Sequence, residues 1–153
     1  MGKNFYALGL MSGTSMDGID ASIISSNGID DFEIMQNKYF KYDDKFINKL
    51  SNLKNKIDKL DDFKSHFNDL KSIEKEITIL HAKFTNDILM KFKHKIDLVG
   101  FHGQTIYHNP DEKISKQLGD GKLLSQLIKK KVVYNFREND IKSNGNGAPL
   151  API

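Results

Sequence analysis

The beginning of the chain has the apolar and polar patterning of three consecutive β-strands. Residues 4–12 are apolar at most positions, which predicts a strand buried on both faces, and residues 18–26 alternate between apolar and polar positions. The Asp-Gly pair at 17–18 predicts a hairpin turn between them, because Gly accepts the positive φ that such turns require. A second Asn-Gly turn, at 27–28, precedes a third strand over residues 31–41. We therefore expect an opening three-stranded meander.

Helical spacing follows the meander, first with few apolar positions and then with many. Residues 43–69 are rich in lysine, and their thin apolar spacing predicts one or two surface helices with solvated charges. Residues 70–93 have apolar positions three and four apart, which predicts a long helix with a core-facing stripe. His81 lies beside this stripe, where we expect a structural histidine rather than a ligand.

Shorter elements alternate over the rest of the chain. Residues 96–101, 114–118 and 131–135 have the composition of short strands, and residues 122–130 have the spacing of a helix. A meander followed by β/α units on the same sheet is an α/β layout. The predicted fold is therefore a mixed sheet with flanking helices.

Polar clusters follow three of these predicted strands, at residues 102–105, 119–121 and 135–140. In open α/β sheets, ligands bind beyond the carboxyl ends of the strands. The three clusters and the hairpin near residues 12–18 could therefore converge on one cleft.

Composition excludes several classes of function without selecting one. The chain of 153 residues is long enough for one domain with a core, and a net charge of +3 is too small to indicate nucleic-acid binding. The lack of Cys excludes disulfides and thiolate catalysis in this chain. No apolar run is long enough to span a membrane and no signal-peptide pattern is present, so we expect a cytoplasmic protein without a membrane partner. The single arginine, Arg137, stands out among many lysines.

The hairpin between the first two strands has the residue types of a phosphate-binding turn. Gly13 and Gly18 permit close approach of phosphate oxygens to backbone N–H groups, and Ser12, Thr14 and Ser15 supply hydroxyls. The Lys-Ser/Thr pair that ends a Walker A loop is absent at this spacing. An ordinary hairpin with polar turn residues explains the pattern as well, so the residues alone leave both interpretations open.

Carboxylates near the hairpin are candidates for a magnesium site. Asp17 and Asp20 could help hold Mg²⁺, directly or through water, because this ion takes one or two carboxylates together with phosphate oxygens. A metal site of His102 and His108 would lack a third good ligand, so we reject it.

The remaining clusters offer groups that bind sugars or move protons. His102, Gly103, Gln104 and Thr105 supply an imidazole, an amide and a hydroxyl, which suit sugar hydroxyl or acetamido groups. Asp120, which opens the predicted helix, is by itself better explained as an N-cap.

Asp140 follows the last predicted strand and lies close in sequence to Arg137. A carboxylate at such a position can act as a general base if it faces the cleft. Taken alone, an Arg137–Asp140 surface pair or a cap explains these two residues better than catalysis does.

Four motifs, in this order, resemble the anhydro-N-acetylmuramic acid kinase family. They read GLMSGTSMDGID, GFHGQTIYH, QLGDG and NFRENDI followed by GNGAPLAP. The resemblance extends from about residue 5 to the last residue, and its first and last motifs are long and specific. Members of this family have the sugar kinase/Hsp70/actin-type fold. The resemblance therefore implies an α/β lobe of the ribonuclease H-like, actin-like ATPase type.

The resemblance also implies an activity. The family uses ATP and Mg²⁺ to open the anhydro bridge of 1,6-anhydro-N-acetylmuramic acid by adding water at C1 and to phosphorylate O6. The product, N-acetylmuramic acid 6-phosphate, belongs to peptidoglycan recycling and amino sugar metabolism.

The family motifs can be carried over to positions in this chain. Asp140 matches the catalytic base, and Asp17 is the candidate metal residue, directly or through water. The match to the ATP phosphate-binding segment comprises Gly13, Thr14, Ser15, Met16, Asp17, Gly18, Ile19 and Asp20. The match to the sugar pocket comprises His102, Gly103, Gln104, Thr105, Asp120 and Arg137.

Two features depart from the family pattern. Residues 143–147 read Ser-Asn-Gly-Asn-Gly where the family usually has a Gly-Gly-Gln-Gly run, so Asn stands for Gln and two glycine positions are changed. The chain also ends within the last motif, whereas the family continues into a second lobe that carries most of the adenosine pocket.

The length of the chain therefore predicts the N-terminal, sugar- and phosphate-binding lobe only, over residues 1–153. The C-terminal lobe would have to be supplied in cis or in trans, and we expect little or no kinase activity from the isolated chain. Two alternatives stay open: a non-catalytic half-kinase binding module, and another sugar kinase of the same fold. A homodimer also stays open.

Overall fold

The computed structural model describes residues 4–148, with only the backbone described at position 139. The strands are β1 (Phe5–Ser12), β2 (Gly18–Ser26), β3 (Phe32–Lys41), β4 (Leu98–Asn109), β5 (Ile114–Leu118) and β6 (Val132–Tyr134). The helices are α1 (Asp44–Lys54), α2 (Asp62–Ser65), α3 (Phe67–Lys91), α4 (Gly121–Ile128) and α5 (Phe136–Lys142). The predicted meander and the predicted long helix are both confirmed.

The six strands form one mixed sheet in the order β3-β2-β1-β4-β5, with β6 also paired to β4. β1, β2 and β3 are antiparallel neighbours, whereas β4 runs parallel to β1 and β6 runs parallel to β4. β5 pairs antiparallel with the second half of β4, from Gln104 to Asn109. The predicted α/β layout is thus confirmed, because a β/α extension continues the sheet of the meander.

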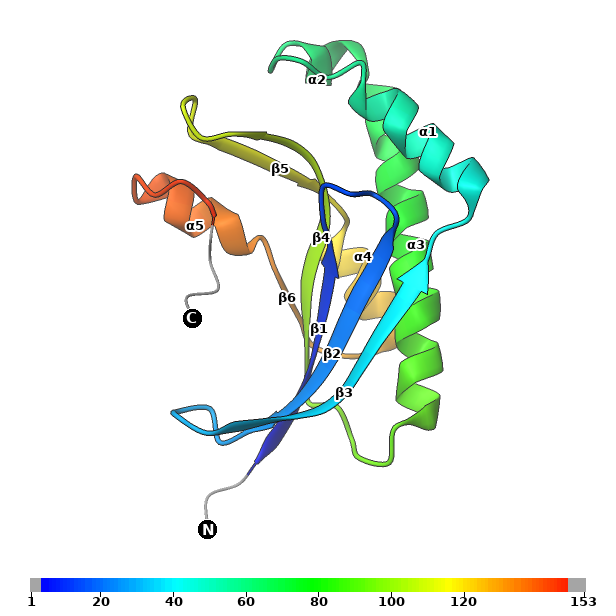
Figure 1. Ribbon diagram of the computed structural model, residues 1–153, viewed down its shortest axis with the longest axis vertical. Coiled ribbons are helices and arrows are strands. Elements are labelled where there is room, and N and C mark those ends of the chain that lie inside the picture. Colours follow the sequence, from blue (N-terminus) through cyan, green and yellow to red (C-terminus); the bar gives the residue numbers. More distant parts are fainter. Residues whose placement is uncertain (1–3, 149–153) are drawn as a thin grey trace.

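The long helices cover one face of this sheet, and Figure 1 shows α3 on that side and α5 on the other. The Phe84 ring of α3 stacks on Phe40 of β3 at 4.5 Å, and His81 of α3 meets the Phe101 ring of β4 edge-on at 4.9 Å. Leu8, Ile19 and Val99 are fully buried under these helices. The core therefore lies between the sheet and α1, α3 and α4.

The opposite face is partly open, which corrects the expectation that the first strand is buried on both faces. Burial alternates along β1, so that Leu8 and Leu10 face the helices while Met11 is 45% exposed. Helices α1, α3 and α4 lie on the other face, so Met11 stays partly exposed although its side chain is apolar.

One further predicted boundary is wrong in a way that affects the site, and one helix near the site was not predicted. β4 runs from Leu98 to Asn109, so the polar cluster at 102–105 lies inside a strand rather than after its end. The polar cluster at 135–140 does follow a strand, and most of it forms α5, a helix that was not predicted. Backbone pairing with β1 and β5 on either side of β4 extends the strand beyond its apolar part.

Among residues 4–148, no helix has the length and apolar character needed to cross a lipid bilayer.

Candidate functional site

The connection between β1 and β2 is a turn over residues 13–17, which we call the β1–β2 turn. The Met16 N–H donates to the Gly13 carbonyl at 3.3 Å, and Met16 itself has a φ of 57° with a buried side chain. The predicted positive φ at Gly18 is wrong. Gly18 is needed for another reason, because a Cβ there would lie 2.4 Å from the Phe40 carbonyl oxygen of β3.

The outer part of the β1–β2 turn offers free hydrogen-bond donors. Thr14 and Ser15 are exposed, and their backbone N–H groups have no acceptor among the described residues. The Ser15 hydroxyl donates to the exposed Asp17 carboxylate. This bond and a second one from Tyr39 lower the pKa of Asp17, so its carboxylate is ionised at neutral pH. Exposed N–H donors next to an ionised carboxylate suit phosphate and a divalent cation.

The other predicted phosphate-binding residues fall on both faces of β2. Ile19 is fully buried in the core, so its side chain is not accessible to a ligand. Asp20 is exposed and lies on the open face, where it lines a shallow hollow of about 260 Å³ with Met11, Ser22 and Phe136. The structure thus leaves Asp17 within the turn and Asp20 on the adjoining strand.

Buried hydrogen bonds hold the β1–β2 turn from beneath. The Ser12 hydroxyl lies 2.6 Å from Oε1 of Gln104, 2.7 Å from the Gly18 carbonyl and 3.0 Å from the Tyr42 hydroxyl. The Gln104 Nε2 donates to the Gly13 carbonyl and, at 3.2 Å, to the Thr105 carbonyl. Burial raises the pKa of Tyr42 to about 12, so it stays a neutral partner.

These contacts revise the role expected for residues 102–105. Both N–H donors of the Gln104 carboxamide are bonded inside the protein, and Gln104 and Thr105 are 0% and 3% exposed. Gly103 has a φ of 74°, and a Cβ there would lie 2.5 Å from the Leu118 carbonyl oxygen. Of this cluster, only His102 is half-buried rather than buried. Gln104 therefore fixes the turn, and its amide has no donor left for a sugar.

His102 and Arg137 come together although they are far apart in the sequence. The Arg137 Nε donates to Nε2 of His102 at 3.1 Å, and its Nη1 donates to the Ser115 hydroxyl at 3.2 Å. The other ring nitrogen of His102 lies 2.9 Å from the Gly103 carbonyl oxygen. Burial and the Arg137 charge lower the pKa of His102, which favours the neutral ring that this geometry requires.

Asp140 lies on α5, and its carboxylate is held by the loop that follows the helix. The Gly147 N–H donates to Oδ2 of Asp140 at 2.7 Å. At Gly145, a Cβ would lie 2.2 Å from the same carboxylate oxygen, so only glycine leaves room for the observed position. The predicted Arg137–Asp140 ion pair does not form, because Arg137 bonds to His102 and Ser115 instead.

The same loop explains how the changed tail motif is tolerated. Asn144 has a φ of 69°, so the backbone does need a left-handed residue where the family pattern has glycine. Asn is among the few non-glycine residues that adopt this conformation readily. Its side chain also accepts a hydrogen bond from Lys113 at 3.1 Å, which ties the loop to the β4–β5 hairpin.

Asp120 is an N-cap, as its sequence context favoured. Its side chain accepts from the Leu123 N–H at 2.9 Å, and its own N–H donates to the Thr78 hydroxyl of α3 at 3.0 Å. Among the described residues it makes no hydrogen bond to the other candidate site residues. The bonds of Asp120 therefore hold the start of α4 against α3.

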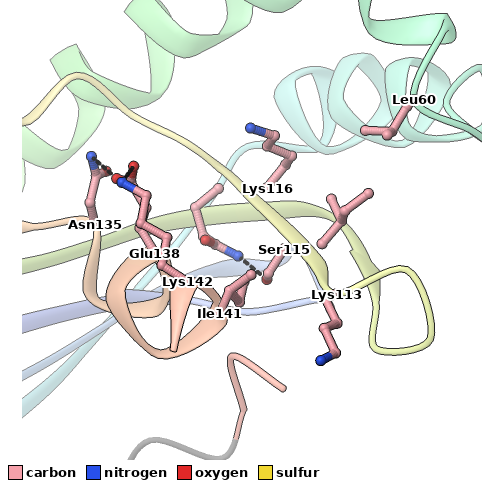
Figure 2. Close-up of a pocket in the computed structure, with 10 residues that line it drawn as sticks. Leu60, Lys113, Ser115, Lys116, Asn135, Glu138, Ile141 and Lys142 are labelled. Carbon is pink, nitrogen blue, oxygen red and sulfur yellow. Dashed lines mark hydrogen bonds and ion pairs between the residues drawn. The ribbon is translucent and has the colours of Figure 1, made fainter. Parts of the chain in front are cut away.

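A pocket of about 530 Å³ lies between β5 and α5, as Figure 2 shows. It is lined by Leu60, Lys113, Ile114, Ser115, Lys116, Gln117, Asn135, Glu138, Ile141 and Lys142. Asn135 and Glu138 belong to the predicted polar cluster at 135–140, whereas sequence reasoning missed the lining residues outside it. Polar Ser115 and Gln117 at alternate positions of a short strand were a usable signal. The volume is within the range of small-molecule sites.

No group of three or more His, Asp or Glu side chains gathers as a metal site within the described part of the chain. Mg²⁺ needs only one or two protein carboxylates, because phosphate oxygens and water complete its shell. Asp17, exposed and ionised next to free N–H donors, fits that chemistry.

The sheet order and the turn between its first two strands define a lobe of the actin-like ATPase class. The model of the family described as anhydro-N-acetylmuramic acid kinase matches residues 5–153. The chain therefore belongs to the anhydro-N-acetylmuramic acid kinase family, whose members are phosphotransferases.

Curated relatives bearing that name resemble the chain over nearly all of its length. The protein from Pelagibacter ubique is 54% identical over 153 residues, which is 100% of this chain and 41% of that protein. The protein from Rhizobium etli is 40% identical over 149 residues, and that from Agrobacterium fabrum is 37% identical over 155 residues. These two matches cover 95% and 99% of this chain and 40% and 42% of the relatives. The chain thus spans about two fifths of the relatives' length.

Proposed function

We propose that residues 1–153 form the N-terminal lobe of a kinase that phosphorylates 1,6-anhydro-N-acetylmuramic acid with ATP and Mg²⁺. The β1–β2 turn carries this proposal, because it places free N–H donors beside an ionised Asp17 and is held rigid by Gln104. Rigid, oriented donors stabilise the charge of a transferring phosphoryl group without reorganisation during the reaction.

Each residue has a defined part in this reaction. Asp140 accepts a proton from a water molecule as that water attacks C1, and the C1–O6 bond breaks. O6 then attacks the γ-phosphoryl group, and the bond to the β-phosphate breaks to release ADP. The N–H groups of Thr14 and Ser15 bind phosphate oxygens. Asp17 would hold Mg²⁺, directly or through water, and the ion would neutralise phosphate charge.

The loop after α5 supports the assignment of Asp140. Gly145 makes room for the carboxylate, and the Gly147 N–H fixes one of its oxygens, which leaves the other oxygen without a bond to a described residue. A general base needs a free oxygen of this kind within reach of the water that it deprotonates.

The chain covers 41% of the Pelagibacter ubique relative, which supports our proposal that a second lobe is needed for activity. We propose that this lobe supplies most of the adenosine site and closes over the sugar. In its absence, the chain would act as a binding module for sugar or phosphate.

The test supplies the chain with the C-terminal three fifths of the Pelagibacter ubique relative as a separate polypeptide. Sugar phosphate is measured by mass spectrometry after incubation with the anhydro sugar, ATP and Mg²⁺. We expect product with both polypeptides, and Asp140→Asn to lower its rate about 10²–10⁴-fold, the usual contribution of a general base. Asp44→Asn, the same change at an exposed position of α1 outside the pocket, is the control.

Product that forms at an undiminished rate with Asp140→Asn contradicts the role of Asp140. Turnover by the chain alone contradicts the need for a second lobe, and no product with either arrangement contradicts the proposed reaction.

A further inference from the structure

The only arginine of the chain, Arg137, has no counter-charge among the described residues. Arg137 is half-buried, and it forms no ion pair with any carboxylate in the described part of the chain. Its two bonds go to neutral acceptors, Nε2 of His102 and the hydroxyl of Ser115. A partly desolvated charge without a partner is unfavourable, so such a guanidinium is suited to an anionic ligand.

The two neutral acceptors orient the guanidinium and leave one edge of it unused. Nε and Nη1 are bonded, whereas the N–H groups of Nη2 have no acceptor among the side chains and backbone that the structure describes. Because Nδ1 of His102 faces the Gly103 carbonyl, its proton lies there, and Nε2 presents a lone pair to Arg137. His102 is therefore a positioning residue for Arg137, and it does not neutralise the charge.

The surroundings of Ser115 are positively charged. Ser115 lines the pocket of Figure 2 together with Lys113, Lys116 and Lys142. The one carboxylate in its lining, Glu138, already accepts from Lys142 at 2.7 Å. Lys113 and Lys116 therefore give the pocket a positive potential that favours an anion.

The pocket also has groups that bind neutral sugar atoms. Gln117 and Asn135 line it with amide groups, and its volume of about 530 Å³ accommodates one sugar ring. An anion with an attached polar body fits both the charge and the size. Arg137 does not itself line this pocket and is connected to it through Ser115, so the anionic end of the ligand would have to lie beside Ser115.

We propose that Arg137 binds the carboxylate of the acidic sugar and so selects it over neutral sugars. The inference rests on the proposed function, because N-acetylmuramic acid differs from its neutral relatives by a carboxylate on the lactyl ether. Arginine suits carboxylates because its planar fork can form two parallel hydrogen bonds. A nucleotide phosphate is the other source of an anion, because His102, which accepts from Arg137, lies on β4 directly beside β1. The phosphate probe in the test below distinguishes the two sources.

The test uses the intact chain with three probes at matched ionic strength: the anhydro acid, its uncharged methyl ester, and inorganic phosphate. Because Arg137 is the single arginine, its Nε–H gives one resolved signal in ¹H–¹⁵N spectra. We expect the acid to shift this signal and to bind about 10–100-fold more tightly than the ester, which corresponds to hydrogen bonds to a charged group.

Variants separate a specific contact from a general charge effect. Arg137→Gln should reduce the preference for the acid to about twofold or less, and Arg137→Lys should keep part of it, since a single point charge replaces the fork. Ser115→Ala should lower the preference severalfold without removing any charge. Lys75→Gln, which removes an exposed charge on α3, is the control and should keep the full preference.

Equal affinity for acid and ester, or a preference that survives Arg137→Gln, overturns the role of Arg137 and leaves sugar binding intact. A larger shift of the Nε–H signal with phosphate than with the acid also overturns it and assigns Arg137 to the nucleotide. Failure of the chain to bind either sugar overturns the inference together with the proposed sugar site.

Discussion

The Ser12–Gln104 network on the covered side of the sheet and the polar residues on the α5 side are hydrogen-bonded in different ways. On the covered side, beneath α1, α3 and α4, Ser12 and Gln104 bond to each other and to the backbone of the β1–β2 turn, and both are fully buried. On the α5 side, Arg137 and Asp140 are only half-buried, and each keeps atoms without a described partner. Closed polar networks stabilise a fold, whereas open ones are available to ligands.

This contrast predicts that changes on the covered side lower stability, while changes on the α5 side lower activity and leave stability nearly unchanged. Three substitutions test it, in order of expected effect.

Gln104→Leu should have the largest effect. It removes one partner from the buried Ser12 hydroxyl and one from the half-buried Gly13 carbonyl. At about 1–3 kcal/mol for each unsatisfied group, we expect the free energy of unfolding to fall by about 3 kcal/mol. Urea unfolding followed by circular dichroism measures the loss. The exposed Gln126→Leu is the matched control and should change the unfolding midpoint little. An unchanged unfolding midpoint in Gln104→Leu would contradict the predicted difference between the two sides.

His81 should make the stability of the covered side depend on pH. Burial lowers the pKa of this fully buried histidine from 6.5 to about 4. Between these values the unfolded chain binds a proton that the folded protein excludes, so the free energy of unfolding falls as the pH is lowered. By pH 5 the loss attributable to His81 is on the order of 2 kcal/mol.

The measurement compares urea midpoints at pH 7 and pH 5 for the unmodified chain and for His81→Leu. The variant should lose less stability between the two pH values, while His108→Gln, at an exposed position, should follow the unmodified chain. An unchanged pH dependence in His81→Leu would contradict a neutral, buried His81.

Gly145→Ala should have the smallest of the three effects. It should raise the activation free energy of the reaction and leave the free energy of unfolding nearly unchanged. The new Cβ would overlap the Asp140 carboxylate, which would have to move. We expect the two-polypeptide kinase assay to slow about tenfold, which equals about 1.4 kcal/mol. Gly9→Ala, where a Cβ meets nothing closer than 3.9 Å, is the control. A large drop in the unfolding midpoint of Gly145→Ala would place the tail loop among the stabilising parts of the fold.

The patterning predicted the elements well because each depends on local residues. The apolar stripe of α3, the strand pair around the β1–β2 turn and the Asp120 cap all follow from spacing over a few positions. The boundaries of β4 and α5 were less predictable. Polar residues 102–105 join a strand because neighbouring strands supply backbone partners, and no local signal reports such partners.

The sequence by itself determined the order of strands and helices, the glycines and asparagine of the turns, and the motifs that mark the family. The tertiary structure decided which polar side chains use their donors and acceptors inside the protein and which keep some of them unbonded. Ser12 and Gln104 are 92 positions apart, and His102 and Arg137 are 35 positions apart. Their hydrogen bonds exist because the chain places β1, β4 and α5 side by side. A polar side chain is a ligand group only where folding leaves its donors and acceptors unused.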